Sequence, residues 1–456
     1  MSSLVYLKSK SGTVYVYKNI SYWDEGEGRT KSKRKCIGHL NPETGEVVPN
    51  GKRGGYQRKH IQRQKKPLPT CSVNSCGESL LFDKVCADIG LDEVLREVFP
   101  DQWRAILTCA YYLASEGRGL FRAEQWSRVS STPYGKALTR QEIIALLSGF
   151  TPEHALSFFN AWTARHHSSS LTCLCIGCSL SGQLQGGWLT DSHRECPEET
   201  SLLVFNDQTS HLPLYCWLVD GWDISALVER IRQLPEVKNL LLVLDRRYYS
   251  PEQLPVLRDS SLSFVMELPP SAPLVRSAVE RFGDGTEMRS CAVLGDEYQV
   301  CTQTVDRGGH PCWLHCCSEQ AGLADGALPR ASSLLMLLSN RIDDPAEALE
   351  LYHRKRSSAL FFSDLQNELD RKRLSMQSSA SVNGRLFLQW IALMIRARVY
   401  HVMAVNGWLS CFAVQEVVDE MRSLCFVEPT GKATRSYTTV TQFQSEIGAL
   451  FGLEYV

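Results

Sequence analysis

The sequence predicts a mixed α/β protein in which a helical segment separates a basic, β-rich N-terminal region from a larger part built around a sheet. Three observations carry this prediction. Apolar residues recur at helical spacing over residues 71–165, short apolar runs typical of buried strands begin at about residue 171, and the first residues alternate between apolar and polar. A chain of 456 residues is long enough for two or three domains.

Charge is spread unevenly along the chain. Residues 1–66 contain fifteen lysines and arginines against five acidic residues, a net charge of +10, whereas the whole chain carries −1. A basic end on an acidic body predicts a polyanionic partner for that end. Interleaved aromatic residues favour DNA over the alternative of a solvated charge run. The cations expected to neutralise phosphates are Lys31, Lys33, Arg34, Lys35, Lys52, Arg53, Arg58 and Lys59.

Other sequence features narrow the class of protein. No apolar run is long enough to cross a bilayer, and the N-terminus lacks a signal-peptide pattern. These features predict a cytoplasmic protein, nucleoid-associated if it binds DNA, without a membrane partner. The seventeen cysteines are an odd number without a secretory signal, so we expect most of them to be buried as small apolar residues.

The pattern predicts four regions. Residues 1–66 form a DNA-binding β region and arm, with a hairpin over 5–17 and a polar, glycine-bearing arm or linker over 50–67. Residues 67–165 form a helical domain. The main domain spans 166–400, and 401–456 is a C-terminal α/β extension.

The main domain begins with a recognisable order of elements. Strands are expected over 171–179, 201–205, 213–219, 239–245 and 262–268, with helices over 223–234 and 250–257. This order of three strands, helix, strand, helix and strand is that of an RNase H-like core. A β-rich insertion follows at about 270–340, and then two helices over 344–369 and 384–399.

Several short segments, in order along nearly the whole chain, resemble bacterial insertion-sequence transposases of the DDE type. They are VYVY (14–17), SYW (21–23), KRKCIG (33–38), LLVF (202–205), LPLY (212–215), VLDRRYYS (243–250), the helical segment 352–369, and GRLF (384–387). The resemblance implies DNA recombination and transposition, terminal inverted repeats as the DNA partner, a homodimer on DNA, and Mg²⁺ or Mn²⁺ as cofactor.

The family's chemistry requires converging carboxylates. Strand cleavage and transfer use two divalent metals roughly 3.5–4 Å apart, and magnesium takes hard oxygen ligands. The second family aspartate is retained as Asp245, which is then the one candidate metal ligand. The first lies two residues before a Thr-Ser pair in the family. Matching Cys178 and Ser179 to that pair places Ile176 at the aspartate position.

The third family carboxylate is also replaced. The family helix carries a tyrosine, then a basic residue, a glutamate and a lysine at offsets of three, seven and fourteen. The corresponding residues here are Tyr352, Lys355, Ala359 and Gln366. One carboxylate cannot hold two magnesium ions against their hydration. The sequence therefore predicts a DNA-binding relative that has lost catalysis.

Two alternatives remain open at this point. A substitute acid, either Asp191 or Asp364, would make the chain an active transposase. A protein of another class, a zinc-binding scaffold, would use one of two clusters, although neither has paired CxxC spacing. The clusters are Cys173, Cys175 and Cys178, and His310, Cys312, His315, Cys316 and Cys317. Strand alternation is expected to place Cys312 and Cys316 on one face and His315 and Cys317 on the other.

Overall fold

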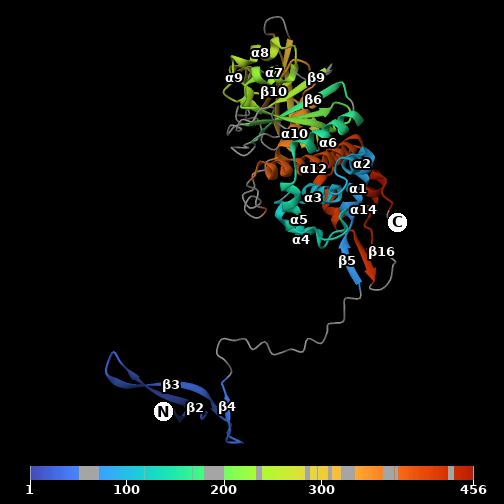
Figure 1. Cartoon of the computed structure of the whole chain (residues 1–456). Helices are drawn as coiled ribbons and strands as arrows, with labels where there is room; N and C mark the ends of the chain where they lie inside the picture. The colour runs from blue at the N-terminus through green and yellow to red at the C-terminus, as the bar shows by residue number, and fades with distance from the viewer. Residues whose placement is uncertain are drawn as a thin grey trace. The chain divides into compact units, whose positions relative to one another are not determined.

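The computed structural model describes residues 2–50, 71–117, 119–166, 168–178, 200–232, 239–282, 288–294, 296–306, 311–319, 334–362, 374, 378–429 and 436–454. The chain divides into two compact units, Met1–Thr70 and Cys71–Val456 (Figure 1). The fold is mixed α/β, as predicted. No helix in the described ranges combines the length and apolar character that a membrane span requires.

The first unit is a four-stranded antiparallel sheet in the order β1-β2-β3-β4. Its strands are β1 (Ser2–Lys8), β2 (Val14–Asp24), β3 (Arg29–Leu40) and β4 (Val47–Pro49). Gly12 and Gly28, both at positive φ, lie in the turns that join β1 to β2 and β2 to β3, where a side chain would be strained. The expected hairpin is present, and the basic run 31–35 lies within β3.

The second unit begins with a short strand and a group of helices. These elements are β5 (Cys71–Ser75), α1 (Gly77–Ile89), α2 (Leu91–Val98), α3 (Trp103–Glu116), α4 (Ala123–Ser127), α5 (Arg140–Ser148) and α6 (Pro152–Arg165). Capping boxes at Thr139 and Thr151 begin α5 and α6, because each threonine accepts a hydrogen bond from the amide three residues later. The helical segment predicted from apolar spacing is therefore present.

A nine-stranded sheet follows, in the order β11-β12-β13-β14-β10-β9-β6-β7-β8. Its first five strands and their helices are β6 (Ser170–Cys178), β7 (Thr200–Asp207), β8 (Pro213–Asp220), α7 (Ile224–Arg232), β9 (Asn239–Leu244), α8 (Gln253–Asp259) and β10 (Ser263–Glu267). Strands β6, β9 and β10 are parallel neighbours, whereas β7 and β8 continue the sheet antiparallel. The element order is the one predicted.

The expected insertion extends this sheet at its β10 edge. It contains α9 (Pro273–Phe282), β11 (Arg289–Val293), β12 (Asp296–Asp306), β13 (Pro311–Glu319) and β14 (Leu335–Ser339). Strand β14 pairs antiparallel with β10, and β13, β12 and β11 follow outward.

Helices cover both faces of the sheet, and alternate strand residues separate two hydrophobic clusters. Cys173 and Cys175 join the cluster that contains residues of α7, α8 and α9. Leu174 and Ile176 join the other cluster, which contains residues of α10 (Pro345–Phe362) and α12 (Ser379–Val405). A strand buried on both faces explains why β9 is apolar at every position from Leu240 to Leu244.

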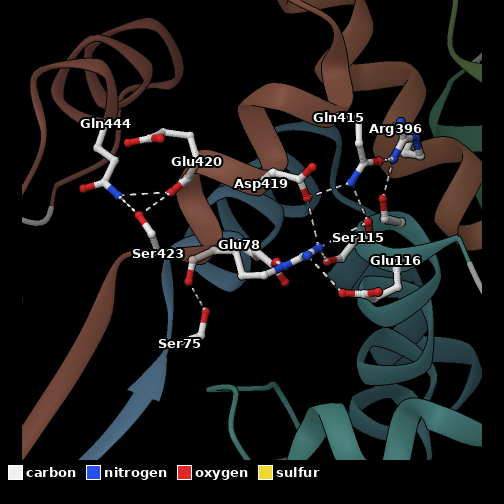
Figure 2. A network of polar contacts seen from close by, with 12 residues as sticks. Ser75, Glu78, Ser115, Glu116, Arg396, Gln415, Asp419, Glu420, Ser423 and Gln444 are labelled. Carbon is white, nitrogen blue, oxygen red and sulfur yellow. Dashed lines mark hydrogen bonds and ion pairs between the residues drawn. The ribbon is translucent and has the colours of Figure 1, made fainter.

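The last segment folds back onto the helical segment. It comprises α13 (Val414–Arg422), β15 (Cys425–Pro429), β16 (Ser436–Tyr437) and α14 (Gln442–Phe451), and β15 pairs with both β16 and β5. A polar network anchors this return (Figure 2): the Arg422 guanidinium contacts Glu78 of α1 and the Glu116 carboxylate of α3, at 3.0 Å from the latter.

Candidate functional site

Asp245 directly follows β9, at the carboxyl end of the central parallel strand. Its Oδ1 accepts a hydrogen bond from the Arg247 backbone N–H at 3.1 Å and so caps the short 3₁₀ turn Arg246–Tyr248. Strand β9 lies between β6 and β10, and the three strands run in the same direction. The topology therefore brings the ends of three strands to one edge of the sheet.

The two positions expected to match the family acids lie on the side of the sheet that Asp245 faces. Ile176 is fully buried on β6, in the same cluster as Val243 of β9. Ala359 is half-buried on α10 and packs against that cluster. Helix α10 contacts β6, and it also supplies the side chain that reaches Asp245. Apolar groups thus occupy both positions.

Two cations hold the Asp245 carboxylate. The Lys355 ammonium lies 3.3 Å from Oδ2, and the Arg247 Nε lies 3.2 Å from Oδ1. The Lys355 side chain is only 4% exposed, so water screens this pair weakly. Burial alone would raise the pKa of Asp245, but the charges of Lys355 and Arg247 and the Arg247 amide outweigh it and hold that pKa below its usual value.

The Arg247 guanidinium also lies against two other elements. It is 4.2 Å from the ring centroid of Trp222, a cation–π contact, and its terminal nitrogen lies where a Cβ on Gly177 would be. Gly177 therefore leaves room for this side chain beside β6. The guanidinium therefore occupies the space between β6 and the Asp245 carboxylate.

A second carboxylate, Glu267, ends β10, where the preceding residue Met266 pairs with Leu244 of β9. Burial raises the pKa of Tyr352, and the nearby Glu267 carboxylate, which the Tyr352 hydroxyl contacts, raises it further. The Lys355 ammonium lies 5.1 Å from the Tyr352 ring centroid. Glu267 was not among the residues predicted from the sequence, although an acid at the end of a buried apolar strand is the signal that marks Asp245.

These residues do not fit a pair of divalent metals. Within the described ranges, no three His, Cys, Asp or Glu side chains gather where they could hold a metal ion. Asp245 is held by a lysine and an arginine. The predicted positions Asp191, Asp364 and Gln366 lie outside the described residues.

Most described residues of the two Cys/His clusters are buried in the protein core. Cys173 and Cys175 are fully buried among the residues between the sheet and α7–α9. His315 uses both ring nitrogens, at 2.9 Å from Thr302 Oγ1 and 3.0 Å from the Ile342 carbonyl. The expected faces are found for the cysteines, since Cys312 and Cys316 share one cluster and Cys317 joins the other. His310 and the Cys178 side chain lie outside what is described.

The structure describes four of the eight cations predicted to contact DNA. Lys33, Arg34 and Lys35 are exposed on β3, whereas Lys31 forms ion pairs with Asp24 at 2.6 Å and Glu27 at 2.8 Å. The other four cations predicted to contact DNA, Lys52, Arg53, Arg58 and Lys59, lie outside the described residues.

Comparison with known proteins adds no relative: no family model matches the chain, and no curated protein is significantly similar to it.

Proposed function

We propose that this chain is a relative of DDE transposases, built on an RNase H-like core, that binds DNA without cleaving it. The strand order β8-β7-β6-β9-β10, with β6, β9 and β10 parallel, supports the core assignment. The basic sheet of the first unit supports a DNA partner.

One observation carries the loss of cleavage. Asp245 is bound by Lys355 and Arg247, while Ile176 and Ala359 occupy the positions expected to supply the other acids. Phosphodiester cleavage by this route needs metals that activate the attacking oxygen and stabilise the leaving oxygen. A neutralised single carboxylate provides no such ligand set, so DNA that binds here stays intact.

A nicking assay on supercoiled plasmid with Mg²⁺ or Mn²⁺, run beside a fluorescent-duplex binding assay, tests this proposal. We expect binding without nicking. Nicking that Asp245→Ala abolishes, and that the exposed control Asp259→Ala leaves unchanged, would overturn the loss of cleavage. Nicking abolished by both Asp245→Ala and Glu267→Gln would assign Glu267 as a substitute carboxylate in place of Asp191 or Asp364. Absence of duplex binding would remove DNA as the partner.

By the same resemblance we propose that two copies bind paired DNA ends. Light scattering on the protein with and without a duplex tests this, and one copy per duplex at saturation would contradict it.

A further inference from the structure

We propose that duplex DNA is bound by one face of the sheet in the first unit, the face that carries Lys18, Lys33 and Lys35. This inference rests on the proposed DNA-binding function and states which surface performs it. We call this surface the lysine face.

Strand register defines the lysine face. Lys18 of β2 lies directly opposite Lys35 of β3, and Ile20 lies opposite Lys33. On the other side of β2, Lys18 lies opposite Leu4 of β1. Residues directly opposite each other in antiparallel strands project to the same face, and so do alternate residues of one strand. The three lysines therefore form one cluster that crosses two strands.

A β-bulge creates this cluster. The pairing of β2 with β3 shifts between Val16 and Tyr17, where Ile37 is the extra residue in β3. Without the extra residue, Lys18 would lie opposite Cys36, and Lys33 and Lys35 would project from the opposite face. A bulge of this kind re-aims every side chain beyond it.

The opposite face carries far less charge. There, Asn19 lies opposite Arg34, Ser21 opposite Ser32, and Trp23 opposite Thr30. Arg34 is the one lysine or arginine among these residues, although the sequence places it between Lys33 and Lys35. The two faces thus differ sharply in charge, and the lysine face is the one that attracts an anion.

Three lysines of the lysine face repel one another. Among the described residues, no carboxylate forms an ion pair with Lys18, Lys33 or Lys35. Lys31, opposite Tyr22 on the same face, is instead paired with Asp24 and Glu27. Like charges directly opposite in a sheet, as at Lys18 and Lys35, are destabilising. A polyanion relieves this repulsion and releases its counterions on binding.

The lysine face continues from the three-stranded part of the sheet, which carries Lys18 and Lys35, onto a two-stranded ribbon whose shape fits a duplex. Beyond the Ser2–Ile20 pair, β2 and β3 continue as a two-stranded ribbon to the turn at Gly28. A two-stranded β-ribbon fits the major groove of B-DNA. Ile20 and Tyr22 on the lysine face are 45% and 47% exposed, so apolar contact with bases accompanies the phosphate contacts.

The test compares two double variants of the full chain that each remove two positive charges. Lys33→Gln/Lys35→Gln alters the lysine face, and Lys10→Gln/Arg34→Gln alters an exposed turn and the opposite face. Duplex affinity is measured by fluorescence anisotropy over a range of salt. We expect the first variant to bind more weakly, and the negative slope of log affinity against log salt to become shallower by about 1.8. The control keeps the slope of the unaltered protein.

Further arms separate the possible outcomes. Lys33→Arg/Lys35→Arg keeps the slope, because charge is retained, and circular dichroism verifies that each variant is folded. An unchanged slope in Lys33→Gln/Lys35→Gln, with a reduced slope in the control, overturns the lysine face but leaves DNA binding intact. Failure of the unaltered protein to bind a duplex overturns the proposed function instead. Binding to phosphatidylserine vesicles in preference to DNA overturns both.

Discussion

At the scale of single residues, the central feature is a carboxylate held by two cations. Asp245 contacts Lys355 and Arg247, and Arg247 is accommodated by the absence of a side chain at Gly177. A buried ion pair contributes little to stability compared with apolar packing, but breaking it leaves an uncompensated charge. Breaking the Asp245–Lys355 pair should therefore lower the free energy of unfolding measurably.

Replacing Lys355 by methionine is expected to destabilise the second unit by about 3 kcal/mol, because the Asp245 carboxylate loses its buried partner. Asp245→Asn/Lys355→Met is expected to cost less than the sum of the two single changes, because the residues interact directly. Urea unfolding of the four proteins in this cycle measures the difference. Additive costs would contradict a coupled pair.

His211 provides a pH-dependent contribution. Burial, followed by the charges of Arg354 and His401, lowers the pKa of His211 to about 4, from an ordinary value of 6.5. The unfolded chain binds a proton between these values and the folded chain does not, so stability is lost as pH falls from 6.5 toward 4. His211→Asn tolerates the φ of 57° at this position and is expected to flatten that loss. Urea midpoints measured across this pH range test it, and an unchanged pH dependence would count against the assignment.

At the scale of elements, α10 separates two environments. Lys355 and Tyr352 lie on the side that faces Asp245 and Glu267. Leu351, Arg354 and Ser358 instead line a hollow of about 750 Å³, which residues of α12 and β6 also line. Helical spacing of three residues places Tyr352 and Lys355 on one side of α10.

Introducing at three positions the residues that the proposed relatives carry is expected to create a metal site. Ile176→Asp/Ala359→Glu alone places acids among apolar groups and beside Arg247, which lowers stability. Adding Arg247→Gly removes one competing cation. We expect Mn²⁺ to raise the melting temperature of this triple variant, by an amount that corresponds to about 2.7 kcal/mol at a hundredfold excess over its dissociation constant. Equal stabilisation of the unaltered protein would show that the acids are not involved.

At the scale of the whole molecule, the C-terminal segment packs against the first helices of the second unit. Strand β15 pairs with β5, and Arg422 reaches Glu78, which is only 2% exposed. The Arg422 Nη2 also lies 2.8 Å from Ser115 Oγ and 3.3 Å from the Asp419 carboxylate. The C-terminal segment is thereby part of the helical core, and its loss exposes α1.

Arg422→Leu is expected to cost about 3–5 kcal/mol, because Glu78 stays buried without its cation. Burial raises the pKa of Glu78 despite Arg422, so its contribution to stability is present below pH 4.5 and falls as pH rises through the higher folded value. Glu78→Gln should remove that fall, and Glu78→Gln/Arg422→Leu should recover part of the stability lost in Arg422→Leu. Chemical unfolding at several pH values tests all three variants, and a steeper pH dependence in Glu78→Gln would contradict the prediction.

The sequence by itself determined the kind and order of the elements. Strand and helix periodicity depend on neighbouring residues, so the helical segment, the order from β6 to β10 and the β-rich insertion could all be predicted. The position of Asp245 at a strand end could also be predicted, since it depends on the pattern of one segment. Ile176 and Ala359 were singled out by the resemblance to family motifs, and their role stays a prediction.

Only the tertiary structure decided which groups meet. The contacts of Asp245 with Lys355, 110 residues away, and of β15 with β5 depend on packing between segments that are distant in the chain. The lysine face depends on one bulged residue, Ile37, because a shift of one residue moves every later side chain to the other face. Local pattern carries no information about such a shift, since both registers satisfy the same alternation.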